Sequence, residues 1–95
     1  MNIVWSRPAR QDLRELVAYI AADNPAAART VLGRIKAAVE GLREHPQRGR
    51  PGRVAATREL VIPPTPYLVP YRIKNNRLEV LRVYHSARRW PDSFQ

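Results

Sequence analysis

The segment at residues 83–91, VYHSARRWP, gathers most of the side chains in this chain that could act on another molecule or bind it. Its candidate residues are Tyr84, His85, Arg88, Arg89 and Trp90. A histidine can accept and donate a proton near neutral pH, and a neighbouring tyrosine can act as a weaker acid. Two guanidinium groups and an indole are instead the groups most often found as binding anchors. The segment therefore predicts either proton-transfer chemistry on a phosphodiester or docking on a larger target.

Chemistry on a phosphodiester requires groups beyond this segment. When the 2′-OH of an RNA attacks its own phosphate, a base takes the hydroxyl proton, an acid protonates the leaving oxygen and a cation stabilises the developing charge. The candidate catalytic residues are Glu59, Arg72, Arg82, Tyr84 and His85. Glu59 would be the base, and the arginines would hold the phosphate. In an unbroken strand, alternation places Arg82 and Tyr84 on one face and His85 on the other.

A docking surface, the second hypothesis, needs no general base. Its candidate residues are Arg58, Arg82, His85, Arg88, Arg89 and Trp90. Arginine suits this role because its planar guanidinium recognises phosphate and carboxylate groups in a bidentate manner. Structural roles compete with both hypotheses, since His85 can be an ordinary hydrogen-bonding residue and Trp90 can pack against the sheet. For Glu59 we favour an ion pair with an arginine on the next strand over a catalytic role.

The charge of the chain is large and unevenly distributed. Seventeen basic and eight acidic residues give a net charge of +9. Residues 1–44 hold seven basic and five acidic residues, whereas residues 45–95 hold ten and three. A second half this basic predicts a polyanionic target or an acidic protein partner. A general preference for arginine as the solubilising residue is the simpler alternative.

Composition limits the other possibilities. Ninety-five residues predict a single domain, 1–95, near the small end of what folds on one core. The absence of cysteine excludes disulfides and thiolate metal sites and fits a reducing cytosol. No apolar run approaches the ~18 residues of a membrane span, so we expect a soluble, cytoplasmic protein with no membrane partner. Metal-ligand clusters and glycine-rich phosphate loops are also lacking, and we expect no cofactor and no metal.

Two helices are predicted in the first half. Asn2–Trp5 is typical of a short strand, and Ser6 can cap a helix over residues of about 8–22. The pair Asn24-Pro25 ends that helix and starts a second one, whose apolar stripe runs to about Glu44. Because the break is so short, the two helices must fold back as an antiparallel hairpin. Trp5 is expected to pack under this hairpin.

The second half is predicted to form a sheet after an exposed basic loop at residues 45–57. The strand-like runs are Arg58–Ile62, Tyr67–Lys74 and Arg77–His85. Asn75-Asn76 predicts a tight turn between the last two. Pro70 must occupy a position where its missing N–H is not needed. The predicted fold class is α+β, in the order β-α-α-β-β-β, with the helical hairpin packed on one face of a mainly antiparallel, twisted sheet.

Four motifs in this second half form a recognisable series. They are RELV at 58–61, YLVPYRI at 67–73, VLRVYH at 80–85 and ARRWP at 87–91. In this order, behind a strand and a helical hairpin, they resemble the RelE/ParE superfamily of bacterial type II toxins over essentially the whole chain. The ending HSARRWP is similar to that of ParE-like and plasmid-stabilisation members.

The resemblance implies a growth-inhibiting toxin. A labile, ParD-like cognate antitoxin would hold it inactive. RelE-like members cut mRNA in the ribosomal A site, and ParE-like members poison DNA gyrase. The ending favours a gyrase poison that docks through Arg88, Arg89 and Trp90 and performs no catalysis. The alternative is a RelE-like endoribonuclease. Some histidine-bearing nucleases of the superfamily end in a Tyr-His-like pair, which Tyr84-His85 resembles, although ten residues follow His85 here. RelE-like nucleases place lysines and arginines around the scissile phosphate, and this chain has only two lysines, Lys36 and Lys74.

The expected partner is an acidic, partly disordered antitoxin segment that folds on the toxin, covers the helical hairpin and reaches the sheet. The resemblance also implies a heterotetramer or larger complex that binds operator DNA through the antitoxin. A third class, a basic module that binds nucleic acid directly, remains open. It is less well supported because the sequence lacks a recognition helix-turn-helix, an aromatic RNP platform, a GXXG loop and zinc ligands.

Overall fold

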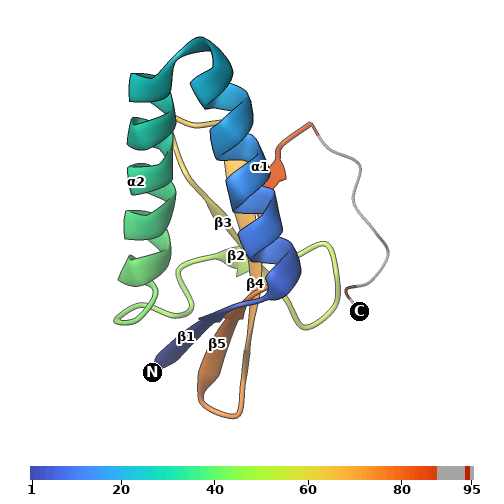
Figure 1. The fold of residues 1–95 in the computed structure, drawn as a ribbon. Helices are drawn as coiled ribbons and strands as arrows, with labels where there is room; N and C mark the ends of the chain where they lie inside the picture. Colours follow the sequence, from blue (N-terminus) through green and yellow to red (C-terminus); the bar gives the residue numbers. More distant parts are fainter. Residues whose placement is uncertain (88–93, 95) are drawn as a thin grey trace.

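The computed structural model describes residues 1–87 and Phe94, in which a helical hairpin covers one face of a mixed sheet (Figure 1). The elements are β1 (Asn2–Trp5), α1 (Arg7–Asp23), α2 (Pro25–Gly41), β2 (Arg50–Pro51), β3 (Arg58–Val61), β4 (Tyr67–Lys74), β5 (Arg77–Val80) and β6 (Tyr84–His85). The sheet order is β1-β5-β4-β3-β2, and β6 pairs with β4. Only β1 and β5 are parallel among these pairs. The predicted α+β architecture is confirmed.

Both helices begin where their capping residues predict. The Ser6 hydroxyl accepts the N–H of Ala9 at 3.1 Å, and the Asn24 side chain accepts that of Ala27 at 3.0 Å. Each cap satisfies an N–H that has no partner within the helix. The predicted end of the second helix at Glu44 is wrong, because α2 ends at Gly41. Its last carbonyls accept N–H groups three residues ahead, which tightens the chain into turns before Pro46.

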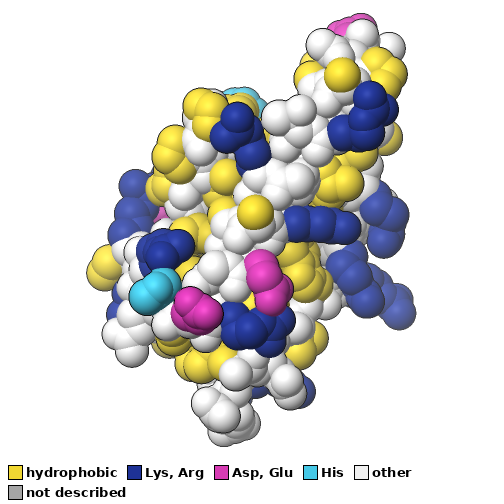
Figure 2. Space-filling model, turned by 90° about the vertical axis from the view of Figure 1, so that its left-hand side faces the viewer, with side chains coloured by type: hydrophobic (Ala, Val, Ile, Leu, Met, Phe, Trp, Pro, Cys, Tyr) yellow, Lys and Arg dark blue, Asp and Glu magenta, His cyan; other side chains and the backbone are white. Residues whose placement is uncertain are grey.

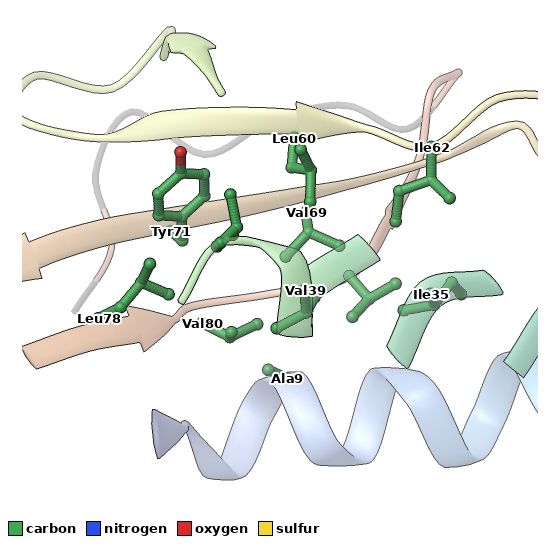
Figure 3. Packing of buried hydrophobic residues seen from close by; sticks show 11 residues of the cluster. Ala9, Ile35, Val39, Leu60, Ile62, Val69, Tyr71, Leu78 and Val80 are labelled. Carbon is green, nitrogen blue, oxygen red and sulfur yellow. The ribbon is translucent and has the colours of Figure 1, made fainter. Parts of the chain in front are cut away.

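The core lies between the hairpin and the sheet (Figure 3). Ala9, Ile35 and Val39 contribute from the helices and face strand residues such as Val69 and Val80, all fully or almost fully buried. Trp5 is partly buried and packs against this cluster, as predicted. Neither helix in the described part of the chain is long and apolar enough to cross a membrane.

The basic loop at residues 45–57 is more ordered than predicted. Two of its residues form β2, where Arg50 pairs antiparallel with Glu59 of β3. The buried hydroxyl of Tyr71 accepts the Gly49 N–H at 2.9 Å and donates to the Pro46 carbonyl at 2.7 Å. These contacts from distant residues order a segment that has no strand periodicity of its own.

The predicted strand Arg77–His85 is interrupted at residues 81–83. Tyr71 pairs with Val80 but Leu68 pairs with Tyr84, so one extra residue bulges out of the second strand. The bulge lies opposite Pro70, whose carbonyl accepts the Leu81 N–H at 2.9 Å. Pro70 has no N–H to return the bond, and the Leu81 carbonyl accepts the Ser6 hydroxyl at 2.9 Å instead. The missing donor of Pro70 is thus tolerated at a bulge.

Candidate functional site

The tail residues Arg88, Arg89 and Trp90 lie outside the described residues, so their docking role stays a prediction. The ring of Phe94 stacks on that of Tyr84, with centroids 6.4 Å apart. Phe94, which follows the candidate binding residues in the sequence, therefore contacts the sheet.

Glu59 lies in β3 and is 2% exposed. Its carboxylate accepts Arg50 Nε at 3.2 Å and Arg50 Nη2 at 3.1 Å, and it also accepts the backbone N–H of Arg53 at 2.7 Å. The guanidinium of Arg53 lies 3.9 Å away. The preferred prediction of an ion pair is correct, although the arginines come from the preceding loop and β2. A carboxylate enclosed in this way is poorly placed to take a proton from a substrate.

Arg58 and Arg72 line one hollow of about 360 Å³ at the end of the sheet. Arg58 donates to the Gly49 carbonyl at 2.8 Å, and Arg72 forms a cross-strand ion pair with Glu79 at 2.8 Å. Both guanidinium groups keep part of their surface exposed, so they could still contact an anion. The structure thus brings together Arg72, a candidate catalytic residue, and Arg58, a candidate docking residue.

Arg82 is held by Asp12, a residue that sequence reasoning missed. The Asp12 carboxylate accepts Arg82 Nε at 2.7 Å, Arg82 Nη2 at 2.9 Å and the Val83 N–H at 3.0 Å. This bond to Asp12 raises the pKa of Arg82 above its ordinary value. One sequence signal could have indicated this role, because Asp12 is an acidic residue beside the apolar stripe of α1, between Ala9 and Leu16. The pair holds the bulge after β5 against α1.

Tyr84 and His85 point to opposite faces of the sheet. Tyr84 is 1% exposed, and Arg82 lies over its ring with Cζ 5.0 Å from the centroid. His85 is exposed, accepts the Ala87 N–H on Nδ1 at 3.1 Å and meets the ring of Tyr67 edge-on at 5.7 Å. Of the two, only His85 is open to a ligand.

The five candidate catalytic residues do not converge on one point. Glu59 lies opposite Pro70 and His85 opposite Tyr67, three residues apart along β4. Three residues of a strand span about 10 Å. Residues an odd number of positions apart point to opposite faces of a sheet, so Glu59 and His85 lie on opposite faces. The arrangement offers no acid–base pair around a single phosphate.

A second hollow, of about 420 Å³, lies between α1 and β6. Its lining combines aromatic and acidic side chains, and includes Glu15, Tyr19, Tyr67 and His85. Tyr19 is 81% exposed. Residues 1–87 and Phe94 contain no group of three or more histidine, cysteine or acidic residues that could hold a metal ion.

The fold is that of toxins from bacterial toxin–antitoxin systems. A chain of the chromosomal ParDE system of P. aeruginosa superposes with a TM-score of 0.80 and 27% identity over 90% of this chain and 95% of that chain. A chain of the RelBE2 complex of Mycobacterium tuberculosis gives 0.59 and 26% identity, over 88% and 95%.

Sequence similarity defines the family. The model of the ParE toxin of the type II toxin–antitoxin system parDE matches residues 3–90, and the chain belongs to this family. The toxin Y4kP of Sinorhizobium fredii is 47% identical over 95% of this chain and 93% of its own length. Toxin RelE2 of Caulobacter vibrioides is 37% identical over 92% and 97%. The resemblance to RelE/ParE toxins stated from the motifs is confirmed.

Proposed function

We propose that this toxin inhibits growth by binding DNA gyrase and stabilising its cleaved DNA complex, without itself breaking a covalent bond. The observation that carries the proposal is that four of the five candidate catalytic side chains are paired within the protein or buried. Glu59, Arg72 and Arg82 are held in internal ion pairs, and Tyr84 is buried. A nuclease would need these groups free to reach one phosphate.

The comparisons support the same target. The matching family model is that of ParE toxins, and the ParDE chain superposes more closely than the RelBE2 chain. The alternative, a ribosome-dependent mRNA endoribonuclease, is favoured by two observations. The exposed imidazole of His85 is free to meet a substrate beside Tyr67. Two relatives also bear the name RelE.

In this proposal, Arg88, Arg89 and Trp90 contact gyrase or its bound DNA. An acidic, partly disordered antitoxin neutralises the toxin in the cytoplasm, in a heterotetramer or larger complex that binds operator DNA through the antitoxin. Both structural relatives come from toxin–antitoxin pairs, which supports an antitoxin partner. The net charge of +9 favours an acidic one.

Two reactions with the purified protein distinguish the targets. In the first, the toxin is incubated with gyrase, ATP and plasmid DNA. In the second, it is incubated with translating ribosomes and mRNA, and cuts are located by primer extension. Trapped linear DNA or lost supercoiling supports gyrase poisoning. Cuts in the ribosomal A site, with gyrase unaffected, would overturn it.

The tail is best tested by substitution, because removing residues 87–95 would also remove Phe94 from Tyr84. We expect Arg88→Gln/Arg89→Gln and Trp90→Ala each to weaken gyrase inhibition at least about tenfold, as loss of a binding anchor does. Antitoxin binding should persist. Arg29→Gln/Arg34→Gln on α2 removes the same charge and is the matched control. Unchanged inhibition by both tail variants would refute the docking role.

His85→Gln separates a nuclease from a docking protein. Removal of a general acid or base lowers a reaction rate by about 100-fold or more. We expect gyrase inhibition to stay within about twofold of the wild-type value, because His85 makes only local contacts with Ala87 and Tyr67. Loss of ribosome-dependent cleavage in this variant would instead assign the imidazole a catalytic role.

A further inference from the structure

Arg7, Arg10 and Arg14 lie on one face of the first half of α1. Residues three, four and seven apart share a helix face. All three are exposed and, with Pro8 and Gln11, they line one hollow of about 440 Å³. We propose that this arginine stripe (Arg7, Arg10 and Arg14) binds the phosphodiester backbone of a nucleic acid. The inference deepens the proposed function, since gyrase acts on DNA, but it rests on different residues from the tail.

The arginines of the stripe have no acidic partner among the described residues, whereas several arginines of the basic second half do. Arg50, Arg72 and Arg82 each pair with a carboxylate. No acidic side chain among residues 1–87 forms an ion pair with any arginine of the stripe, and the one side-chain bond is from Arg14 to Gln11 at 2.7 Å. Figure 2 shows Lys and Arg side chains, in dark blue, projecting from the right-hand side of the molecule.

The charges of α1 are sorted around the helix. The arginine stripe lines one hollow, whereas Asp12 and Glu15 line the separate hollow beside β6. The carboxylates therefore do not screen the guanidinium groups by ion pairing. The stripe offers an anion three guanidinium groups that are not paired with a carboxylate of the described residues.

Folding alone does not explain three cations at this end of α1. The N-terminus of a helix carries partial positive charge, and like charges three or four residues apart repel each other. The first turn of α1 contains no acidic residue to offset them. A sequence that departs from local stability in this way indicates a site with another role.

The dimensions of the stripe fit a nucleic acid strand. Seven residues of helix span about 10 Å. Successive phosphates of one DNA strand are about 3.4 Å apart along the axis, so the stripe can contact a short run of them. An acidic peptide fits less well, because protein interfaces usually combine arginine with aromatic anchors in a desolvated centre. The large hydrophobic residues exposed in the described chain, Met1, Val4, Tyr19, Val61 and Ile73, all lie outside the stripe.

The test is binding to bare nucleic acid, measured by fluorescence anisotropy over a series of salt concentrations. One arm uses a short DNA duplex and the other a single-stranded RNA of the same sequence, so that the preferred source of the phosphates is identified. The variant Arg7→Gln/Arg10→Gln/Arg14→Gln is compared with Arg29→Gln/Arg34→Gln/Lys36→Gln on α2. Both remove three positive charges from exposed helical positions.

We expect the stripe variant to bind at least about tenfold more weakly at low salt in one or both arms. The slope of log affinity against log salt should fall by about 2–3, because about three phosphate contacts are lost. The α2 variant should keep a slope close to the wild-type value. Equal losses in the two variants would overturn the inference, since net charge would then suffice.

Two further readouts complete the test. The melting temperature of the stripe variant should equal or exceed that of the wild type, because unfavourable charges are removed. Weaker binding of an acidic antitoxin peptide, with nucleic acid affinity unchanged, would assign the stripe to a protein partner and overturn the proposal. If the stripe variant binds both the DNA and the RNA normally while the tail variants lose gyrase inhibition, the stripe proposal alone fails. If the stripe variant loses affinity for RNA and the wild-type toxin leaves gyrase activity unchanged, the stripe proposal holds and only the proposed gyrase target fails.

Discussion

Tyr71 fixes the loop after α2 to the sheet through one buried hydroxyl. Replacement by phenylalanine removes both of its hydrogen bonds and leaves the buried N–H of Gly49 without its partner. We expect Tyr71→Phe to lower the unfolding free energy by about 1–3 kcal/mol, measured by urea denaturation at neutral pH. Tyr19→Phe, at a residue that is 81% exposed, is the control and should change it by less than about 0.5 kcal/mol.

The same residue predicts how stability depends on pH. Burial raises the pKa of Tyr71, and the bond from Gly49 offsets this only in part. An unfolded tyrosine loses its proton near pH ~10, so above that pH the unfolded state binds fewer protons and stability falls. The advantage of wild type over Tyr71→Phe should be constant from neutrality to about pH 9. It should then shrink by at most about 1.4 kcal/mol per pH unit. A constant advantage at higher pH would contradict the prediction.

Asp12 joins two elements, since its carboxylate on α1 holds the bulge that leads into β6. Asp12→Asn leaves the Arg82 guanidinium without a charged partner. We expect the unfolding free energy to fall by about 2–3 kcal/mol, less than for a fully enclosed pair because the Arg82 side chain is 27% exposed. Hydrogen exchange at Val83–His85 should accelerate. The control Asp23→Asn, at the exposed end of α1, should show neither effect.

Local signals explain which elements were predictable. Ser6 and Asn24 cap helices whose apolar stripes repeat over many residues, so sequence alone predicted α1 and α2 closely. The bulge after Val80 depends on contacts with Pro70, Ser6 and Asp12, which no local pattern encodes. The same limit applied to the candidate site. Residue types suggested Glu59 and Arg82, but the partners that engage them come from β2 and α1.

For the whole molecule, the net charge of each sequence half does not indicate where unpaired positive charge lies on the folded surface. The second half contributes most of the net charge, yet several of its arginines are paired with acidic residues, including Asp12 from the first half. The nearly neutral first half presents an unpaired cationic stripe on α1. Sequence halves are therefore poor guides to the surface that a polyanion meets.

Across the whole molecule, we expect the tail and the stripe to act separately. A toxin that combines Trp90→Ala with the three stripe substitutions should lose gyrase inhibition as the product of the two individual effects, because independent sites contribute additively to free energy. Titration of supercoiling activity with each variant measures this. A combined loss no larger than that of Trp90→Ala would indicate that the stripe plays no part at gyrase.

The strand order also governs when a newly made chain can fold. β1 leaves the ribosome before the other strands, but its strand neighbour β5 begins only at Arg77. The hydroxyl of Ser6 likewise bonds to a residue 75 positions later. A polypeptide still missing its last quarter therefore has an unpaired first strand and an incomplete sheet. The sheet is complete only after β5 and β6 have been synthesised, and a product that stops before Arg77 lacks both strands.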